Sequence, residues 1–366
     1  MKVLQIAHDY FNTALYSRLF SSLAEYGVEN VGLAAVPVNA QLKGELPPDF
    51  FTLRVSTLPR ILFYPKQRQI AEFVKGMECY PSIDVIHAHT LFSAGYAARK
   101  LRQEKGTPYI VAVRNTDVNV FFKRMVHLRG AGVRIMQDAY RVIFLSPAYR
   151  DFVIERYVPS ELQAGIREKS LVIPNGIDDY FLQNQPEPRG QISKPVSLLY
   201  VGEINSNKNL ELIIQAADLL RQQGTDVFLT VVGNIMEEKY RSMIEGAPFV
   251  TYFPRCSKED VLKHLRQSDL FVMPSHTETF GLVYAEAMSQ GIPVLYTRGQ
   301  GFDGQFPEGT VGYAVSDRDA DDLAEKIRMV LSDYPNLSAN CIKNASRFDW
   351  HKIAEEYRDI YQSAIQ

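Results

Sequence analysis

The feature that most constrains this chain is an alternation of short apolar, β-branched runs with longer amphipathic segments, which occurs twice. The short runs predict strands at residues 3–7, 31–35, 85–87, 109–113, 142–145 and 171–173, and again at residues 197–201, 227–232, 270–273 and 293–296. Helical periodicity predicts helices at residues 13–26, 94–105, 209–223, 282–290 and 350–365. This pattern is typical of an α/β fold with two doubly wound parallel sheets.

The chain is long enough for two domains, because its 366 residues are more than twice the roughly 150 of an average domain. Residues 184–195 are rich in Pro and polar side chains and follow neither periodicity, so we place the join there. We expect one domain over residues 1–188, a second over 189–346 and a final helix within 347–366. Ligands of open parallel sheets bind beyond the carboxyl ends of strands, so we expect a cleft site lined by the loops that follow them.

The composition argues against several classes of protein. Forty basic residues nearly balance 42 acidic ones, which argues against a nucleic-acid-binding protein. Three scattered cysteines are too few for a disulfide framework or a zinc cluster and fit a reducing compartment. No apolar stretch approaches the roughly 18 residues of a membrane span, and the run at residues 3–7 is too short for a signal peptide. We therefore expect a cytoplasmic protein.

The segment from residue 271 to residue 294 carries the most chemical information. A buried strand ends at Pro274, and Gly281 permits a tight turn into a helix whose first N–H groups are unpaired, a natural phosphate site. Glu278 precedes this helix and Glu286 lies about one turn inside it. Two such carboxylates suit the hydroxyl groups of a sugar and a ribose. The alternative, two solvated glutamates flanking a helix, is disfavoured by this context.

The pair Glu278-x7-Glu286 resembles the signature of the retaining family 4 glycosyltransferases, which have the GT-B fold. Further segments resemble motifs of that family in the same order: Asp84-Val-Ile-His-Ala-His89, Ile173-Pro-Asn-Gly-Ile-Asp178, Tyr200-Val-Gly202 with Lys208-Asn-Leu210, and Asp349-Trp350 followed by Tyr357 and Tyr361. The resemblance spans nearly the whole chain. It implies two Rossmann-like domains facing across a cleft, with acceptor bound by the first and donor by the second, and a closing helix that crosses back onto the first domain.

The resemblance also implies roles for individual residues toward a nucleoside diphosphate sugar. Glu286 would bind the ribose, and Glu278 would contact the sugar near the reacting carbon. Lys208, in the loop that begins at Gly202, would meet the diphosphate as a compact point charge.

Other parts of the second domain would complete this pocket. The backbone amides of Phe280, Gly281 and Leu282 would face the diphosphate. Arg255, in the loop 253–255, would lie near the base, the alternative being an ordinary turn. His276 is the histidine that we expect to touch ligand, because it precedes Glu278 in the same loop.

Three loops depart from the family pattern. Glu203 stands where the phosphate loop usually has Arg, so the diphosphate would lose a cation and face a like charge. Arg114 and Asn115 begin a loop that usually reads His-Gly-Thr-Asp. We expect both at the catalytic centre, with Arg114 holding developing negative charge, the alternative being an Arg that bridges the domains structurally. Residues 9–13 replace a glycine pair after the first strand, which leaves the contacts of that loop open.

Together these features predict a retaining glycosyltransferase that moves a hexose-type unit from a nucleoside diphosphate sugar to a glycan, lipid-linked or small-molecule acceptor. A bacterial surface-polysaccharide pathway fits the range of the family. We expect no cofactor and no metal, because cations and helix ends can stabilise the leaving diphosphate. Two alternatives stay open: a non-catalytic sugar- or nucleotide-binding partner subunit of the same fold, and a phosphorylase or epimerase that shares the architecture.

Other signals carry less weight. Gly299-Gln-Gly-Phe-Asp-Gly304 matches a dinucleotide fingerprint only as a string, because no helical pattern opens on it. His87 and His89 alternate along a strand end, which is typical of core histidines. Residues 60–70 and 121–129 mix aromatic and basic side chains. They suit peripheral contact with the inner face of a membrane, or they are helix faces packed by their apolar sides.

Overall fold

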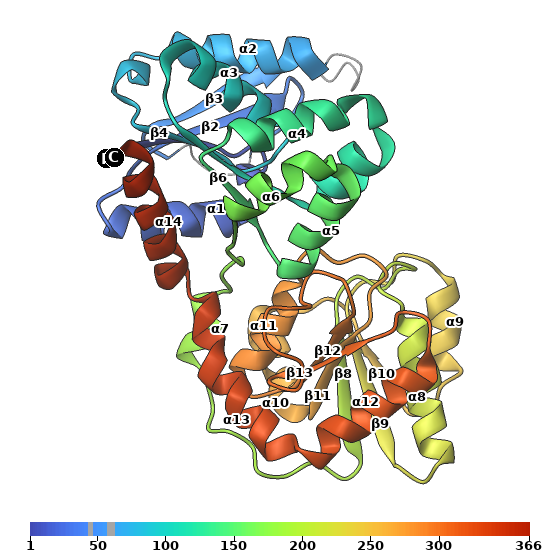
Figure 1. Ribbon diagram of the computed structural model, residues 1–366. Helices are drawn as coiled ribbons and strands as arrows, with labels where there is room; N and C mark the ends of the chain where they lie inside the picture. The colour runs from blue at the N-terminus through green and yellow to red at the C-terminus, as the bar shows by residue number, and fades with distance from the viewer. Residues whose placement is uncertain (43–46, 57–62) are drawn as a thin grey trace. The chain divides into compact units, whose positions relative to one another are not determined.

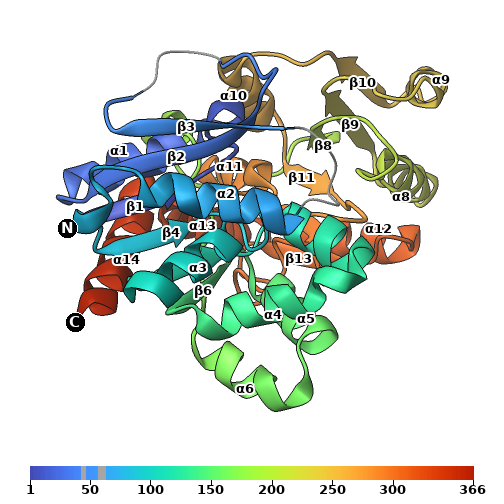
Figure 2. The same cartoon turned by 90° about the horizontal axis from the view of Figure 1, so that it is seen from above.

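The computed structural model describes residues 1–42, 47–56 and 63–366. The chain divides into two compact units, each built on one parallel sheet (Figures 1 and 2). The first unit comprises residues 1–145, 150–175 and 350–366, and the second comprises residues 146–149 and 176–349. Two Rossmann-like units confirm the predicted fold class.

The first unit contains a seven-stranded sheet with the order β3-β2-β1-β4-β5-β6-β7. Its strands are β1 (Lys2–Ile6), β2 (Glu29–Pro37), β3 (Phe50–Val55), β4 (Val85–Ala88), β5 (Tyr109–Ala112), β6 (Arg141–Phe144) and β7 (Ser170–Val172). All neighbouring strands are parallel. β4 and β5 are buried along their whole length, as expected of central strands covered on both faces.

Helices cover both faces of this sheet. They are α1 (Leu15–Glu25), α2 (Phe63–Lys75), α3 (Gly95–Lys105), α4 (Arg129–Asp138), α5 (Pro147–Tyr157), α6 (Ser160–Glu168) and α14 (Trp350–Ile365), with short helical turns η1 (Tyr10–Asn12), η3 (Tyr80–Ser82), η4 (Asp117–Phe122) and η5 (Val126–Leu128). α1 packs beside α14, while α3 packs between α2 and α4 on the opposite face (Figures 1 and 2).

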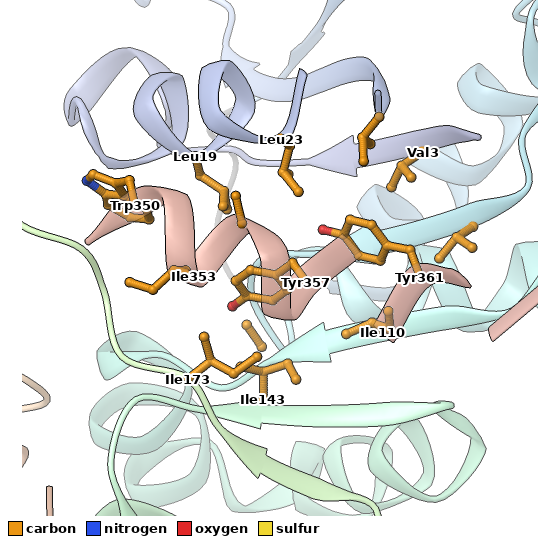
Figure 3. Packing of buried hydrophobic residues seen from close by; sticks show 14 residues of the cluster. Val3, Leu19, Leu23, Ile110, Ile143, Ile173, Trp350, Ile353, Tyr357 and Tyr361 are labelled. Carbon is orange, nitrogen blue, oxygen red and sulfur yellow. The ribbon is translucent and has the colours of Figure 1, made fainter. Parts of the chain in front are cut away.

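The last helix, α14, packs into the core of the first unit, as predicted. Trp350, Ile353, Tyr357 and Tyr361 line its buried side and contact apolar residues of α1 and the sheet (Figure 3). The hydroxyl of Tyr361 lies 2.7 Å from Nδ1 of His87 on β4. Although α14 is the last segment of the sequence, it therefore completes the hydrophobic core that begins with β1.

The second unit contains a six-stranded sheet with the order β10-β9-β8-β11-β12-β13. Its strands are β8 (Val196–Val201), β9 (Val227–Val232), β10 (Val250–Phe253), β11 (Leu270–Met273), β12 (Val294–Thr297) and β13 (Gly312–Val315). Its helices are α7 (Asp179–Gln183), α8 (Leu210–Gln222), α9 (Lys239–Glu245), α10 (Lys258–Gln267), α11 (Leu282–Ser289), α12 (Ala320–Ser332) and α13 (Tyr334–Asn344), followed by the turn η6 (Ala345–Phe348).

Every strand and helix predicted from the sequence is present, with ends within two residues of those expected. Three strands escaped prediction, and all three lie at sheet edges: β3, β10 and β13. An edge strand needs no continuous apolar run, because one side of it faces solvent or a loop. β10 illustrates this, since its four residues are all partly or fully exposed.

The division between the units differs from the predicted boundary at residue 189, since the long segment of the second unit starts at Gly176 and residues 146–149 also belong to that unit. Residues 176–188 belong to it because they bond to its later segments. The Ile177 N–H donates to the carbonyl of Phe348 (2.9 Å), and the side-chain amide of Gln290 donates to the carbonyl of Phe181 (2.9 Å). The second unit likewise extends to Asp349, beyond the predicted end at residue 346.

The two aromatic and basic segments pack mainly by their apolar members. Phe63 and Ile70 of α2 are buried, and residues 60–62 lie outside the described residues. Phe122 is fully buried, whereas Val126 is 58% exposed beside exposed basic residues at positions 123 and 124. Across the described parts of the chain, no helix has the length and hydrophobicity required to span a membrane.

Candidate functional site

The second sheet places two predicted site residues in adjacent loops. Strand order reverses between β8 and β11, which are neighbours at the centre of the sheet. The loop after β8 carries Lys208, and the loop after β11 carries Glu278. In open α/β sheets, ligands bind at this switch point, beyond the carboxyl ends of the strands.

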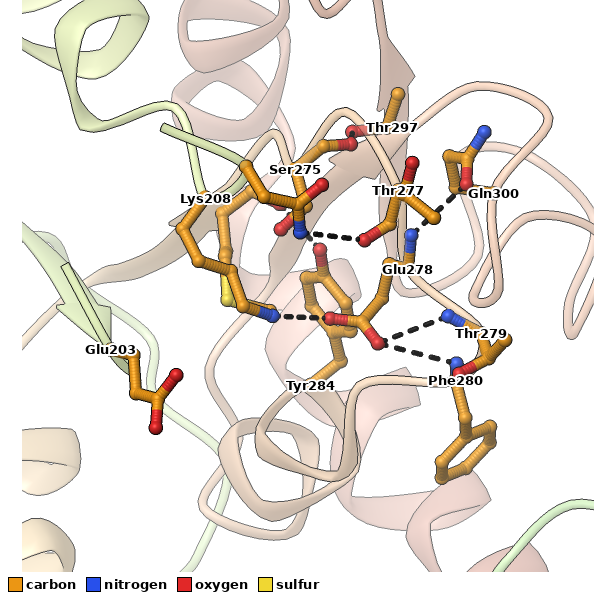
Figure 4. A network of polar contacts seen from close by, with 12 residues as sticks. Glu203, Lys208, Ser275, Thr277, Glu278, Thr279, Phe280, Tyr284, Thr297 and Gln300 are labelled. Carbon is orange, nitrogen blue, oxygen red and sulfur yellow. Dashed lines mark hydrogen bonds and ion pairs between the residues drawn. The ribbon is translucent and has the colours of Figure 1, made fainter. Parts of the chain in front are cut away.

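The Glu278 carboxylate is bound on two sides (Figure 4). Its Oε2 lies 2.6 Å from Nζ of Lys208. Its Oε1 accepts from the backbone N–H of Thr279 at 3.0 Å and, more weakly, from that of Phe280 at 3.5 Å. The side chains are 14% exposed for Glu278 and 21% exposed for Lys208. In this half-buried setting a charge-assisted bond is stronger than on an open surface.

α11 begins directly after this carboxylate. Gly281 precedes the helix with a φ of +76°, a left-handed conformation that favours glycine. Leu282 is the first helical residue, and Glu286 lies half-buried about one turn inside the helix, as predicted. The amides of Thr279 and Phe280, just before α11, thus lie at the Glu278 carboxylate that pairs with Lys208. The N-terminus of a helix favours anion binding.

Phe280 has a structural role beyond its predicted amide contact. Its ring is buried and lies within 6.4 Å of the Phe302 ring and 5.7 Å of the Phe348 ring, centroid to centroid. Its amide points toward the Glu278 carboxylate. The Phe280 amide therefore faces an anion already present in the chain, and whether it also faces a diphosphate stays a prediction.

Gly202 and Arg255 line a cavity of about 350 Å³ at the carboxyl ends of β8, β9 and β10. Its other lining residues are Val201, Glu203, Val232, Gly233, Asn234, Cys256 and Val261. Arg255 is exposed at its edge and follows Phe253, the last residue of β10. The loops that carry Gly202 and Arg255, both predicted from the sequence to lie at the donor site, therefore border the same cavity.

Glu203, which departs from the family pattern, stands apart from the ion pair. Its side chain lies apart from Lys208 and Glu278 (Figure 4), and it borders the cavity instead. Its backbone carbonyl accepts a hydrogen bond from the Tyr200 hydroxyl at 2.7 Å. Because the carboxylate is exposed, water screens its repulsion toward an anion at Lys208.

His276 lies in the Glu278 loop but makes other contacts. Its Nδ1 lies 2.7 Å from a carboxylate oxygen of Asp317, and its side chain is 44% exposed. Its backbone N–H donates to the carbonyl of Asn207 at 2.8 Å. The structure therefore gives His276 a role in holding the loop, and ligand contact by its ring stays a prediction.

Arg114 and Asn115 belong to the first unit, in the loop after β5. The Arg114 guanidinium donates to Oδ1 of Asn175 at 3.0 Å and to the carbonyl of His89 at 3.3 Å. It also lines a small cavity of about 10 Å³ with aromatic residues that include Tyr16 and Tyr357. Asn115 is exposed, and its side-chain oxygen accepts from the Asn119 side chain at 2.6 Å.

Asp117, two residues after Asn115, is a buried carboxylate to which the sequence analysis gave no role. It accepts hydrogen bonds of 2.9 Å from the backbone N–H groups of Leu91, Phe92 and Arg114. Burial raises the pKa of Asp117 to about 6, although these three amides and the Arg114 charge act in the opposite direction. Asp117 therefore ties the loop after β4 to the loop that carries Arg114.

His87 and His89 are core residues of the first unit, as expected. Both side chains are fully buried, and their rings lie in a tilted arrangement with centroids 3.8 Å apart. Nε2 of His89 lies 2.8 Å from the side-chain oxygen of Gln5. Burial lowers the pKa of His87 to about 3, with the Arg114 charge acting in the same direction. In the described part of the chain, no three His, Cys, Asp or Glu side chains form a group that could hold a metal ion.

Comparison with known proteins gives two family matches. Residues 31–180 match the family described as Glycosyltransferase Family 4, and residues 183–348 match Glycosyl transferases group 1. A D-inositol 3-phosphate glycosyltransferase from Geodermatophilus obscurus is 30% identical over 388 aligned residues, which cover 99% of this chain and 81% of that protein. A glycogen synthase from Mycobacterium tuberculosis is 27% identical over 303 residues, covering 77% and 69% of the two chains.

Solved structures share the fold. A sucrose-phosphate synthase from Thermosynechococcus elongatus has a TM-score of 0.73 at 20% identity, covering 99% of this chain and 98% of that one. Anabaena Alr3699/HepE, solved in complex with UDP and glucose, has a TM-score of 0.68 at 20% identity, covering 99% and 100%. With both sheets, the switch-point residues and these matches in agreement, the chain belongs to the family 4 glycosyltransferases of GT-B fold and is a glycosyltransferase.

Proposed function

We propose that this glycosyltransferase moves a hexose-type unit from a nucleoside diphosphate sugar to an acceptor, with retention of configuration and without a metal ion. The observation that carries the proposal is the position of the Lys208–Glu278 pair at the N-terminus of α11, with Glu286 one turn inside that helix. A cation and the N-terminus of a helix suit a diphosphate, and the two carboxylates suit sugar and ribose hydroxyl groups.

In this proposal the leaving diphosphate gains negative charge as its bond to the sugar breaks. Lys208 and the N-terminal dipole of α11 stabilise that charge. A carboxylate so close to a diphosphate would normally repel it. Because Lys208 lies 2.6 Å from Glu278, the ammonium group offsets the repulsion while Glu278 accepts hydrogen bonds from the sugar.

The other predicted site residues have roles toward the ribose, the base and the reacting centre. Glu286 binds the ribose, and the cavity bordered by Gly202 and Arg255 takes the base. Arg114 and Asn115 act at the reacting centre, and the acceptor attacks the same face of the sugar from which the diphosphate leaves. Residues at a reacting centre must be held in place, and the bonds from Arg114 to Asn175 and His89 meet that requirement.

Similar proteins support the choice of a nucleotide-sugar donor and of its acceptor. Anabaena Alr3699/HepE was solved in complex with UDP-glucose. For the acceptor, several relatives carry the name D-inositol 3-phosphate glycosyltransferase. We propose a glycan, lipid-linked or small-molecule acceptor and a role in bacterial surface polysaccharide synthesis. A second transferase that extends the same glycan would then consume the product.

Peripheral contact with a membrane is part of this proposal. The exposed Val126 lies beside basic residues 123 and 124 in the segment 121–129, and such a mixture suits an anionic lipid surface. Flotation with anionic vesicles tests it. Protein that rises with anionic vesicles and not with neutral ones supports the contact, whereas protein that stays below both excludes it.

A thermal-shift panel of nucleoside diphosphates and nucleotide sugars, run with and without a chelator, tests the proposed function. A ligand that binds only the folded chain raises its melting temperature. We expect a selective shift with one base that persists in the chelator. A shift that vanishes with the chelator contradicts metal independence. No shift with any nucleotide contradicts the donor site and favours a non-catalytic partner subunit.

A further inference from the structure

The loop that carries Glu278 is held from one side by Asn207, in the loop after β8. The Asn207 side-chain amide donates to the carbonyl of Thr277 at 2.9 Å. Its backbone carbonyl accepts from the N–H of His276 at 2.8 Å. Asn207 therefore forms hydrogen bonds to both His276 and Thr277, the two residues directly before Glu278. Because Lys208 follows Asn207 in the chain, the same contacts also fix the origin of the Lys208 side chain relative to Glu278.

A second grip comes from the turn after β12. The N–H of Glu278 donates to the side-chain oxygen of Gln300 at 3.0 Å, and the carbonyl of Glu278 accepts from the N–H of Gly301 at 2.6 Å. Both backbone polar groups of Glu278 are thus bound by two adjacent residues. This turn belongs to the segment 299–304, whose glycines resemble a dinucleotide fingerprint in sequence but open no helix in the structure.

The glycine at position 301 allows the two segments to meet. A Cβ atom there would lie 2.1 Å from the carbonyl carbon of Thr279 and 2.2 Å from the amide nitrogen of Phe280. Such distances exclude any side chain, so only glycine lets the turn pack directly on the peptide group between Thr279 and Phe280. The turn and the Glu278 loop are therefore one packed unit.

A glutamate carboxylate is placed accurately only if its backbone is fixed, because three side-chain torsions separate the two. Reacting groups tolerate little displacement, and about 1 Å of misplacement can reduce a rate about a hundredfold. Asn209 anchors the base of the same loop, where its side chain donates to the carbonyl of Pro274 at 3.1 Å. Asn207 and Gln300 act at the tip, next to Glu278 itself.

We propose that Asn207 and Gln300 are positioning residues that set the Glu278 carboxylate against the donor sugar. The inference rests on the proposed role of Glu278 in the transfer reaction. It gives Gln300, which lies between two glycines, a role that the resemblance to the family does not predict. Two side chains from separate loops then hold the backbone around Glu278 in place for the sugar.

The test compares two ligands on matched variants. Gln300→Met keeps the length of the side chain and removes the acceptor oxygen, whereas Gln300→Glu keeps that oxygen. Gln163→Met is the control, since the Gln163 side chain also bonds one backbone group, the carbonyl of Val158 at 3.0 Å in the first unit. Calorimetry gives the dissociation constants of each variant for the nucleoside diphosphate and for the nucleotide sugar selected by the thermal-shift panel, and slow donor hydrolysis gives a rate.

We expect Gln300→Met to weaken binding of the nucleotide sugar about tenfold and to leave binding of the nucleoside diphosphate within about twofold, because only the sugar contacts Glu278. Its hydrolysis rate falls at least as far. Gln300→Glu recovers most of both losses, and Gln163→Met changes neither. Asn207→Asp removes the side-chain N–H donor and preserves the shape of the side chain, so we expect it to weaken binding of the nucleotide sugar as Gln300→Met does. It serves as the test if Gln300→Met does not fold.

Three outcomes overturn the inference. Equal weakening of both ligands means that Gln300 supports the whole pocket. Unchanged sugar binding means that Glu278 needs no such support. A Gln300→Glu variant as impaired as Gln300→Met means that the accepted hydrogen bond is not what matters. If the unaltered chain binds neither ligand, the proposed function fails first, and the positioning role fails with it.

Discussion

Lys208 and Glu278 lie seventy positions apart in the sequence, yet their side chains meet at 2.6 Å beyond the carboxyl ends of two neighbouring strands. The contact joins a cation suited to phosphate with a carboxylate suited to sugar hydroxyl groups. The Lys208 ammonium neutralises the Glu278 carboxylate, so that the carboxylate does not repel a nearby diphosphate. Four predictions follow from this site and from the core of the first unit.

Lys208→Met is expected to weaken binding of the nucleoside diphosphate at least about tenfold, since it removes a charge-assisted bond and leaves the Glu278 charge unneutralised. Isothermal titration calorimetry measures the change. Lys343→Met is the control, because Lys343 is exposed on α13. Affinity within twofold of the unaltered chain would remove Lys208 from the diphosphate site.

Glu286→Ala is expected to cost about 1–3 kcal/mol of nucleotide binding through lost hydrogen bonds to the ribose, which is roughly a 5- to 150-fold change in dissociation constant. Glu325→Ala, at an exposed position of α12, should leave binding unchanged. Comparison of the nucleotide with its 2′,3′-dideoxy form localises the effect. An Ala variant that loses affinity equally for both forms contradicts contact with the ribose.

Gly301→Ala is expected to lower the stability of the second unit by about 1–3 kcal/mol, because the added methyl group collides with the backbone at residues 279–280. Gly190→Ala is the matched control, since a Cβ at Gly190 has no other atom within 4 Å. Thermal unfolding compares the two variants. Equal melting temperatures would show that the turn can move away without cost.

The stability of the first unit is expected to fall as the pH is lowered, partly through His87. Its folded-state pKa is lowered to about 3 by burial, whereas the unfolded imidazole titrates near 6.5. Between these values the unfolded chain binds the extra proton, so the stabilisation present above about pH 6.5 is lost as the pH falls toward 3. One such group contributes a slope of up to about 1.4 kcal/mol per pH unit.

Urea unfolding at pH 4.5 to 6.5 measures this slope. The chain contains one tryptophan, Trp350, which is buried in the first unit, so its fluorescence reports on that unit. His87→Gln should flatten the curve relative to the unaltered chain, and His127→Gln, at an exposed position, should not. Parallel curves for all three proteins would contradict a neutral buried His87.

The fold was predictable where burial imposes a pattern on the sequence. The central strands β4, β5 and β11 are buried along their length, so each reads as an apolar run. The edge strand β10 alternates between partly and fully exposed residues and leaves no such run. Its pairing with β9 is a backbone interaction, which the side-chain sequence does not encode.

The site was predictable where a residue type and its spacing carry the chemistry. Glu278, Glu286 and Gly281 follow from a strand, a turn and a helix in one continuous segment. Asn207 and Gln300 could not be found in this way, because each acts on the backbone of a loop distant in sequence. A side chain that binds backbone places no requirement on the residue type of its partner, so no sequence motif marks the contact.

A crystal structure of the chain with its selected nucleoside diphosphate, grown in the presence of a chelator, tests the account most directly. We expect phosphate oxygens at Nζ of Lys208 and at the first amides of α11, with the ribose hydroxyl groups at Glu286 and the base in the cavity bordered by Gly202 and Arg255. A nucleotide bound elsewhere, or with its phosphates away from Lys208, would contradict it.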